Sequence, residues 1–126
     1  MRNRKICQLS VLALLAGASF LSGARALQKP KTVLQLVTIK WTGEAAPEVR
    51  RAALDGIEKL AMEIPGVQSV WLRTLRTQPR DFMTAFALEF EDQAAADRFA
   101  RHPAHEAWSK TYLPVIEESR VQQVTN

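Results

Sequence analysis

Apolar and polar residues alternate along three segments of the chain, and this alternation predicts three β-strands. The segments are 32–41 (TVLQLVTIKW), 67–76 (VQSVWLRTLR) and 82–90 (FMTAFALEF). A period of two is the spacing of side chains that share one face of a strand. The short loop at 77–81 predicts that the second and third strands form an antiparallel hairpin.

Between the first two strands, apolar residues recur at helical spacing and predict a helix over residues 47–64. Pro47 suits the first turn of this helix, where a missing N–H costs nothing. Pro65 and Gly66 predict its end, because proline cannot continue a helix and glycine tolerates the turn that follows.

Three further elements are predicted after the third strand. Glu91 and Asp92 begin a helix that runs to Arg101, with their charges placed favourably at its N-terminus. A second helical stretch is predicted over 103–118, and a last strand over 119–125. The order β-α-β-β-α-β predicts an α+β fold, the ferredoxin-like sandwich.

The predicted strands carry apolar residues on both faces. Leu34 and Leu36 lie opposite the valines of the first strand, and the alanines of the third lie opposite its phenylalanines. Helices can cover only one face, and the other would leave a larger apolar patch than soluble monomers usually expose. We therefore expect a homodimer that packs sheet against sheet.

Residues 1–26 have the layout of a secretory signal peptide. Basic residues precede an uncharged apolar run over 9–21, and Ala24 and Ala26 suit cleavage after Ala26. The prediction is a secreted or periplasmic protein, with 27–31 as a flexible lead-in and 32–125 as one domain. An uncleaved leader is the alternative, and it would be the only contact with a membrane.

Removal of the leader changes the charge of the protein. The whole chain has 17 basic and 13 acidic residues, and four of the basic ones lie in the leader. The remaining 13 basic and 13 acidic residues cancel and are interleaved, so we expect no nucleic-acid partner. The leader also holds the only cysteine, Cys7, so the mature domain has no disulfide.

Several short motifs resemble the stress-responsive dimeric α/β-barrel (Dabb) family. They are Ile64-Pro65-Gly66-Val67, the segment FALEFED at 86–92 and, most specifically, His102-Pro103-Ala104-His105. The resemblance covers nearly all of residues 32–125 and implies two domains that join their sheets into a barrel. Family membership alone does not define a function.

The resemblance also implies a candidate base. In plant polyketide cyclases of this type, the last histidine of the HPAH segment is a general base, helped by a tyrosine six residues earlier. These positions correspond to His105 and Phe99, and Phe99 has no hydroxyl. Other histidines of those cyclases correspond to positions near Val33 and Thr84. A cyclase of that kind is therefore disfavoured.

The two histidines admit a structural and a chemical interpretation. Pro103 would be the first residue of a helix, which makes His102 its N-cap. His105 has an intrinsic pKa suited to proton transfer near neutral pH, with Glu106 or Glu89 as the orienting group. Two histidines without cysteines do not make a four-ligand zinc site, so we predict no metal and no cofactor.

Aromatic side chains are candidates for a small apolar pocket between helices and sheet. We assign ligand contacts to His102, Phe99, Trp71, Trp108 and Tyr112, and a catalytic role to His105; Trp41 is a further pocket candidate. Core packing is the alternative for the aromatic residues.

Three functions remain open. The leading hypothesis is a stress-associated or small-molecule-binding module. The second is a cyclase-like or monooxygenase-like enzyme that acts on a small hydrophobic or aromatic molecule, with His105 as its base. The third is a structural oligomer.

Overall fold

A computed structural model of the protein describes residue 23 and residues 25–126, so nearly all of the predicted leader lies outside the described residues. The elements are β1 (Val33–Trp41), α1 (Pro47–Glu63), β2 (Val67–Trp71), β3 (Thr84–Phe90), α2 (Gln93–Arg101), α3 (Pro103–Tyr112), the 3-10 turn η1 (Leu113–Val115) and β4 (Ile116–Val124). This order confirms the ferredoxin-like fold. No helix in the described part of the chain is long and apolar enough to cross a bilayer.

The four strands form one sheet in the order β2-β3-β1-β4, with every neighbouring pair antiparallel. The central strands β1 and β3 pair from Val33 opposite Phe90 to Ile39 opposite Thr84. β4 occupies one edge and pairs with β1, for example at Val37 opposite Val121. The C-terminus therefore lies beside the residues that precede β1, and Asn126 donates a hydrogen bond to the Pro30 carbonyl at 2.8 Å.

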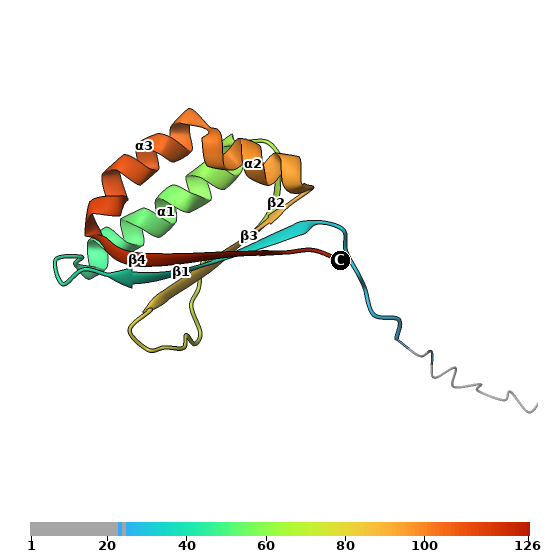
Figure 1. Cartoon of the computed structure of the whole chain (residues 1–126), viewed down its shortest axis with the longest axis horizontal. Coiled ribbons are helices and arrows are strands. Elements are labelled where there is room, and N and C mark those ends of the chain that lie inside the picture. Colours follow the sequence, from blue (N-terminus) through green and yellow to red (C-terminus); the bar gives the residue numbers. More distant parts are fainter. Residues whose placement is uncertain (1–22, 24) are drawn as a thin grey trace, which may run out of the picture.

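All three helices cover the same face of the sheet and leave the other face bare (Figure 1). The core lies between these two layers. Its largest fully buried side chains are Phe90, Ile39, Ile57 and Leu88. The alternation of the strands explains this arrangement, because every second residue of β3 from Thr84 to Phe90 is buried.

Local signals in the sequence explain the helix boundaries. Pro47 is at the start of α1, and the Asp92 carboxylate accepts a hydrogen bond from the Ala95 N–H at 2.7 Å at the start of α2. Gly66 follows α1 with a positive φ of 102°. A Cβ on Gly66 would lie 2.6 Å from the Ala95 Cβ, so both backbone conformation and space favour glycine there.

The second strand is shorter than its sequence pattern predicts. β2 ends at Trp71, whereas the alternation continues to Arg76. Beyond Trp71, the Thr74 side chain makes the hydrogen bonds to β3 that backbone pairing makes within β2. The Thr74 hydroxyl accepts a hydrogen bond from the Ala85 N–H at 2.9 Å and donates one to the Ala85 carbonyl at 3.0 Å. β2 and β3 form the predicted antiparallel hairpin. The loop that joins them spans residues 72–83 and is longer than the predicted 77–81.

The last helix also ends earlier than predicted. α3 stops at Tyr112, and β4 begins at Ile116 instead of residue 119. Pro114 explains the difference, because it has no N–H to donate to the preceding helical turn. The chain instead makes a 3-10 turn and pairs with β1, with Ile116 opposite Trp41.

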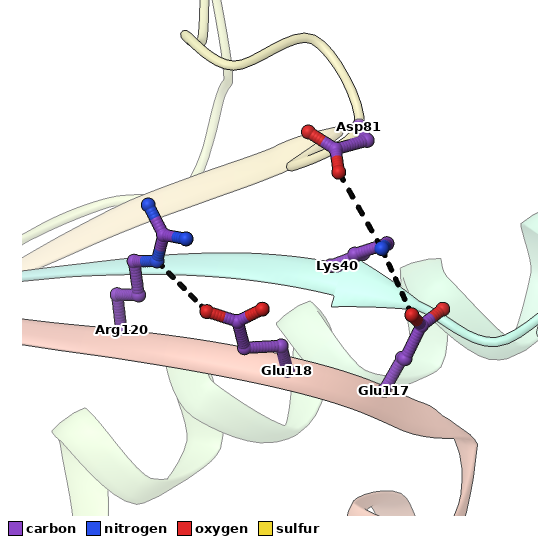
Figure 2. A network of polar contacts seen from close by, with 5 residues as sticks. All are labelled: Lys40, Asp81, Glu117, Glu118 and Arg120. Carbon is purple, nitrogen blue, oxygen red and sulfur yellow. Dashed lines mark hydrogen bonds and ion pairs between the residues drawn. The ribbon is translucent and has the colours of Figure 1, made fainter.

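Charged side chains gather at one end of the bare face (Figure 2). The Lys40 Nζ of β1 lies 2.8 Å from a Glu117 oxygen of β4 and 3.4 Å from an Asp81 oxygen. The hydrogen bond and charge of Glu117, followed by those of Asp81, raise the pKa of Lys40. Arg120 pairs with Glu118 at 2.9 Å. The network therefore links β1, β4 and the end of the 72–83 loop.

Candidate functional site

The HPAH segment joins α2 to α3, and its two histidines have different surroundings. His102 is the N-cap of α3, and its Nδ1 accepts a hydrogen bond from the Ala104 N–H at 3.1 Å. Pro103 occupies the first helical position. This confirms the predicted capping role, which keeps His102 at the helix junction. His105, one turn further, points toward the sheet side of α3 and lines a cavity.

The cavity lies between α3, η1 and the covered face of the sheet. Its volume is about 160 Å³. Its wall is mostly apolar, and the polar contributions come from His105, Ser109, Ser119 and Gln35. The remaining lining residues are Val37, Ile39, Ile57, Phe86, Leu88, Phe99, Trp108, Leu113, Ile116 and Val121. An apolar enclosure with a few convergent polar groups is the usual form of a small-molecule site.

Aromatic rings hold the His105 imidazole in place. Its centroid lies 5.3 Å from that of Phe99 and 6.2 Å from that of Trp108, with the Trp108 and His105 rings nearly parallel at 26°. Phe99 in turn packs edge-on against Phe90 at 5.2 Å. The ring beside His105 is therefore that of a phenylalanine, without the hydroxyl that the plant cyclases place at this position.

Burial lowers the pKa of His105, and a backbone hydrogen bond with Ala100 partly opposes the shift. Ala100 lies in the last turn of α2, where helix carbonyls lack intrahelical partners. A neutral imidazole has one N–H donor and one acceptor nitrogen. With the donor engaged by the Ala100 carbonyl, the other nitrogen can accept a proton or a hydrogen bond from a molecule in the cavity.

Neither carboxylate predicted to orient His105 does so. Glu106 forms an exposed ion pair with Lys110 at 2.9 Å. Glu89 lies on the bare face of the sheet, where hydrogen bonds from Thr32 and then Ser69 lower its pKa. The prediction failed because the actual partner is the backbone of Ala100, which has no signature in the sequence.

The structure brings some of the predicted ligand-binding residues together and separates others. Phe99 and Trp108 line the cavity with His105. Tyr112 packs on Trp108 at 5.4 Å but does not line the cavity. Trp71 is half-exposed on the bare face, away from the cavity. Trp41 is buried in the core, where its Nε1 donates to the Thr84 hydroxyl at 2.8 Å.

Trp108 is held against α1 by two features of that helix. Its indole Nε1 donates a hydrogen bond to the Ala53 carbonyl at 2.9 Å. Its ring lies over Gly56, where a Cβ would come within 2.7 Å of the indole Cδ1. Gly56 therefore permits the close approach of α3 to α1 that positions one wall of the cavity.

The cavity wall also contains three polar residues that were not predicted from the sequence, Gln35, Ser109 and Ser119. Gln35 could have been found, because it shares the alternating side of the first strand with Val33 and Val37. Ser109 and Ser119 carry no comparable signal. No group of three His, Cys, Asp or Glu side chains within residues 25–126 is placed to hold a metal ion.

Comparison with known proteins identifies the class to which this fold and cavity belong. The sequence profile of the Stress responsive A/B Barrel Domain, Dabb, matches residues 33–125. The chain therefore belongs to the Dabb family, as the motif resemblance predicted. A comparison with curated protein sequences finds no match.

Solved structures confirm the fold and include proteins with different functions. A dimeric ferredoxin-like protein of unknown function from Jannaschia sp. CCS1 is 22% identical, with a TM-score of 0.63 over 75% of this chain and 99% of that one. A hydroxynitrile lyase from Passiflora edulis is 16% identical, with a TM-score of 0.68 over 75% and 93%. The cofactor-independent oxygenase SnoaB from Streptomyces nogalater is 17% identical, with a TM-score of 0.63 over 76% and 93%.

Proposed function

We propose that the protein binds a small, largely apolar molecule, about the size of one aromatic ring, in the cavity beside His105. The cavity itself carries this proposal. An apolar cavity of ~150 Å³ in another protein takes up benzene, and this one measures about 160 Å³. Because burial favours the neutral imidazole of His105, the preferred ligand has one hydroxyl or similar donor that can face it.

Phenol and toluene test this proposal, because they have nearly the same size and only phenol donates a hydrogen bond. We expect calorimetry to show tighter binding of phenol, by roughly tenfold if the hydrogen bond contributes about 1.4 kcal/mol. The variant His105→Leu should lose the preference for phenol and still bind toluene. Tyr112→Phe is the matched control, because Tyr112 lies outside the cavity wall and its change should alter neither affinity. Equal affinities in the native protein would contradict the proposal.

A second candidate function is proton transfer by His105 within the same cavity. The observation that favours it is the imidazole itself, which has one nitrogen engaged by a backbone carbonyl and burial that keeps it neutral. Such a group can act as a general base without a carboxylate partner. The hydroxynitrile lyase and the oxygenase that share this fold support the proposal of an enzyme.

Cyanide release from acetone cyanohydrin and mandelonitrile tests the enzyme candidate. The His105 base would take the hydroxyl proton while the C–CN bond breaks, giving a carbonyl compound and cyanide, which leaves as HCN after it takes up a proton. A rate that rises as pH increases through the pKa of His105, and that is lost in His105→Leu, would support this function. A rate no greater than that in buffer alone would exclude lyase activity and leave small-molecule binding as the proposed function.

We further propose that the protein is a homodimer through the bare face of its sheet. That face exposes Leu34, Leu36 and Trp71, at 37%, 39% and 50% of their surface. A second copy is the simplest cover for such a patch. The Jannaschia neighbour, described as dimeric, has the same fold. Sedimentation equilibrium at micromolar concentration should give twice the mass of the chain, and a monomer would contradict the proposal.

Export is proposed from the sequence of residues 1–26. When the full chain is expressed with its own leader in a Gram-negative host, we expect the protein in the periplasmic fraction. Its intact mass should correspond to a chain that begins at Leu27. Recovery of the uncleaved chain in the membrane fraction would instead support an anchor.

A further inference from the structure

The polar groups of the cavity belong to two different walls. His105 and Ser109 lie on α3, which covers the helical side of the sheet (Figure 1). Gln35 and Ser119 lie on the paired strands β1 and β4, which form the sheet wall. The neutral imidazole of His105 offers an acceptor nitrogen. What Gln35 offers depends on its orientation, because an amide presents either an oxygen or two N–H groups.

A chain of glutamine side chains connects Gln35 to the surface of α2. Gln123, directly opposite Gln35 in the pairing of β1 with β4, donates from its amide nitrogen to the Gln35 oxygen at 2.8 Å. Gln93, the first residue of α2, donates to the Gln123 oxygen at 3.0 Å. The same Gln93 nitrogen donates to an Asp97 carboxylate oxygen at 3.1 Å. The chain therefore runs from a carboxylate on α2 to the wall of the cavity.

The carboxylate sets the direction of every amide in this chain. An ionised carboxylate only accepts hydrogen bonds, so the Gln93 amide must turn its nitrogen toward Asp97. The second hydrogen of this nitrogen goes to the Gln123 oxygen. Gln123 must then turn its nitrogen toward Gln35, whose oxygen accepts. Each hydrogen bond in such a chain polarises the next one, so all three amides favour one common direction.

Gln35 consequently has its amide nitrogen left for a molecule in the cavity. This nitrogen donates no hydrogen bond to another group among residues 25–126, and the side chain is half-buried. A donor beside an apolar enclosure favours a ligand oxygen, because an unpaired polar group away from water is unfavourable. The cavity therefore has a hydrogen-bond donor on its sheet wall and an acceptor, His105, on its helical wall.

We propose that Gln35 determines ligand specificity, with its N–H groups directed by Gln123 to bind a carbonyl oxygen. The inference rests on the proposed binding of a small apolar molecule and deepens it, because the ligand now has two polar groups. Its hydroxyl faces His105 and its carbonyl oxygen faces Gln35. The substrate class is therefore a small hydroxylated carbonyl compound. Gln123 is a positioning residue, because it does not line the cavity itself.

Benzaldehyde and styrene test the donor, because they have nearly the same shape and only benzaldehyde has a carbonyl oxygen. Neither molecule has a hydroxyl for His105, so the comparison isolates the sheet wall. We expect calorimetry to show roughly fivefold tighter binding of benzaldehyde, the effect of one neutral hydrogen bond. The variant Gln35→Leu should lose this preference and still bind styrene.

The variant Gln123→Glu tests the orientation of Gln35 without changing the cavity wall. The carboxylate that it introduces only accepts, so the Gln35 nitrogen should turn toward it and leave the amide oxygen facing the cavity. The preference for benzaldehyde should then disappear, while the affinity for styrene stays the same. Gln68→Glu is the matched control, because Gln68 is exposed on β2 at the opposite edge of the sheet. It adds the same charge and should retain the preference.

The possible results separate this inference from the proposed function. Equal affinities of the native protein for the two molecules would overturn the inference and leave the binding cavity standing. A preference that survives Gln35→Leu would overturn it by assigning the donor to Ser109 or Ser119. A preference that survives Gln123→Glu would show that Gln123 does not direct the amide. Binding of neither molecule would overturn the proposed function and the inference together.

Discussion

His102 and His105 take different roles because a helix begins between them. His102 caps α3 at the helix junction, whereas His105 turns inward against Phe99 and Trp108. The hydrogen bond with Ala100 uses a carbonyl that the end of α2 leaves without a helical partner. At the scale of residues, the helix junction thus places a neutral imidazole on the wall of an apolar cavity.

The lowered pKa of His105 predicts how stability depends on pH. Unfolding restores an ordinary pKa of about 6.5, so below this value the unfolded chain binds a proton that the folded chain resists. The contribution of His105 to the free energy of unfolding should therefore stay constant above pH 6.5. It should fall as the pH decreases toward the pKa of the folded state. Urea denaturation at fixed protein concentration between pH 8 and 5 measures this effect.

Matched variants assign that pH dependence to one histidine. His105→Gln removes the half-buried titrating group and should flatten the profile between pH 8 and 5. His102→Asn keeps an N-capping side chain at the start of α3 and should retain the slope. An unchanged slope in His105→Gln would contradict the assignment.

At the scale of elements, the Thr74 side chain holds the loop against β3 after the backbone pairing of β2 has ended. Thr74→Val keeps the shape and removes both hydrogen bonds to Ala85, which leaves a part-buried N–H and carbonyl unpaired. We expect a loss of about 1–3 kcal/mol in the free energy of unfolding. Thr77→Val is the control, since the Thr77 hydroxyl makes no hydrogen bond within the described residues. Equal effects of the two variants would show that the Thr74 bonds do not stabilise the loop.

At the scale of the whole molecule, the proposed dimer depends on the exposed apolar side chains of the bare face, among them Leu36. Leu36→Glu would place a carboxylate in this interface, and burial of an unpaired charge is strongly unfavourable. We expect the dimer dissociation constant to rise at least about 100-fold, measured by sedimentation. Met62→Glu is the control, because Met62 is 76% exposed on α1. A dissociation constant unaffected by Leu36→Glu would exclude this face as the interface.

The order of elements and the two apolar faces of the strands could be predicted from the sequence because both are local patterns. Alternation in 32–41 and 82–90 reports which side chains share a face, whatever the strands pair with. The same reasoning overextended the second strand, because alternation continues past Trp71 although pairing stops there. Pairing depends on the partner strand, and a single segment carries no record of it.

The sequence by itself determined the family, the sandwich of helices and sheet, and the position of the HPAH turn. Only the tertiary structure decided which groups meet at His105. Gln35 lies far along the chain from Ser109 and Ser119, yet all three line one cavity, while Trp71 falls on the opposite face of the sheet. The partner of the imidazole is a backbone carbonyl, which every residue possesses. Contacts of this kind depend on distances in the folded chain, and for that reason sequence patterns do not reveal them.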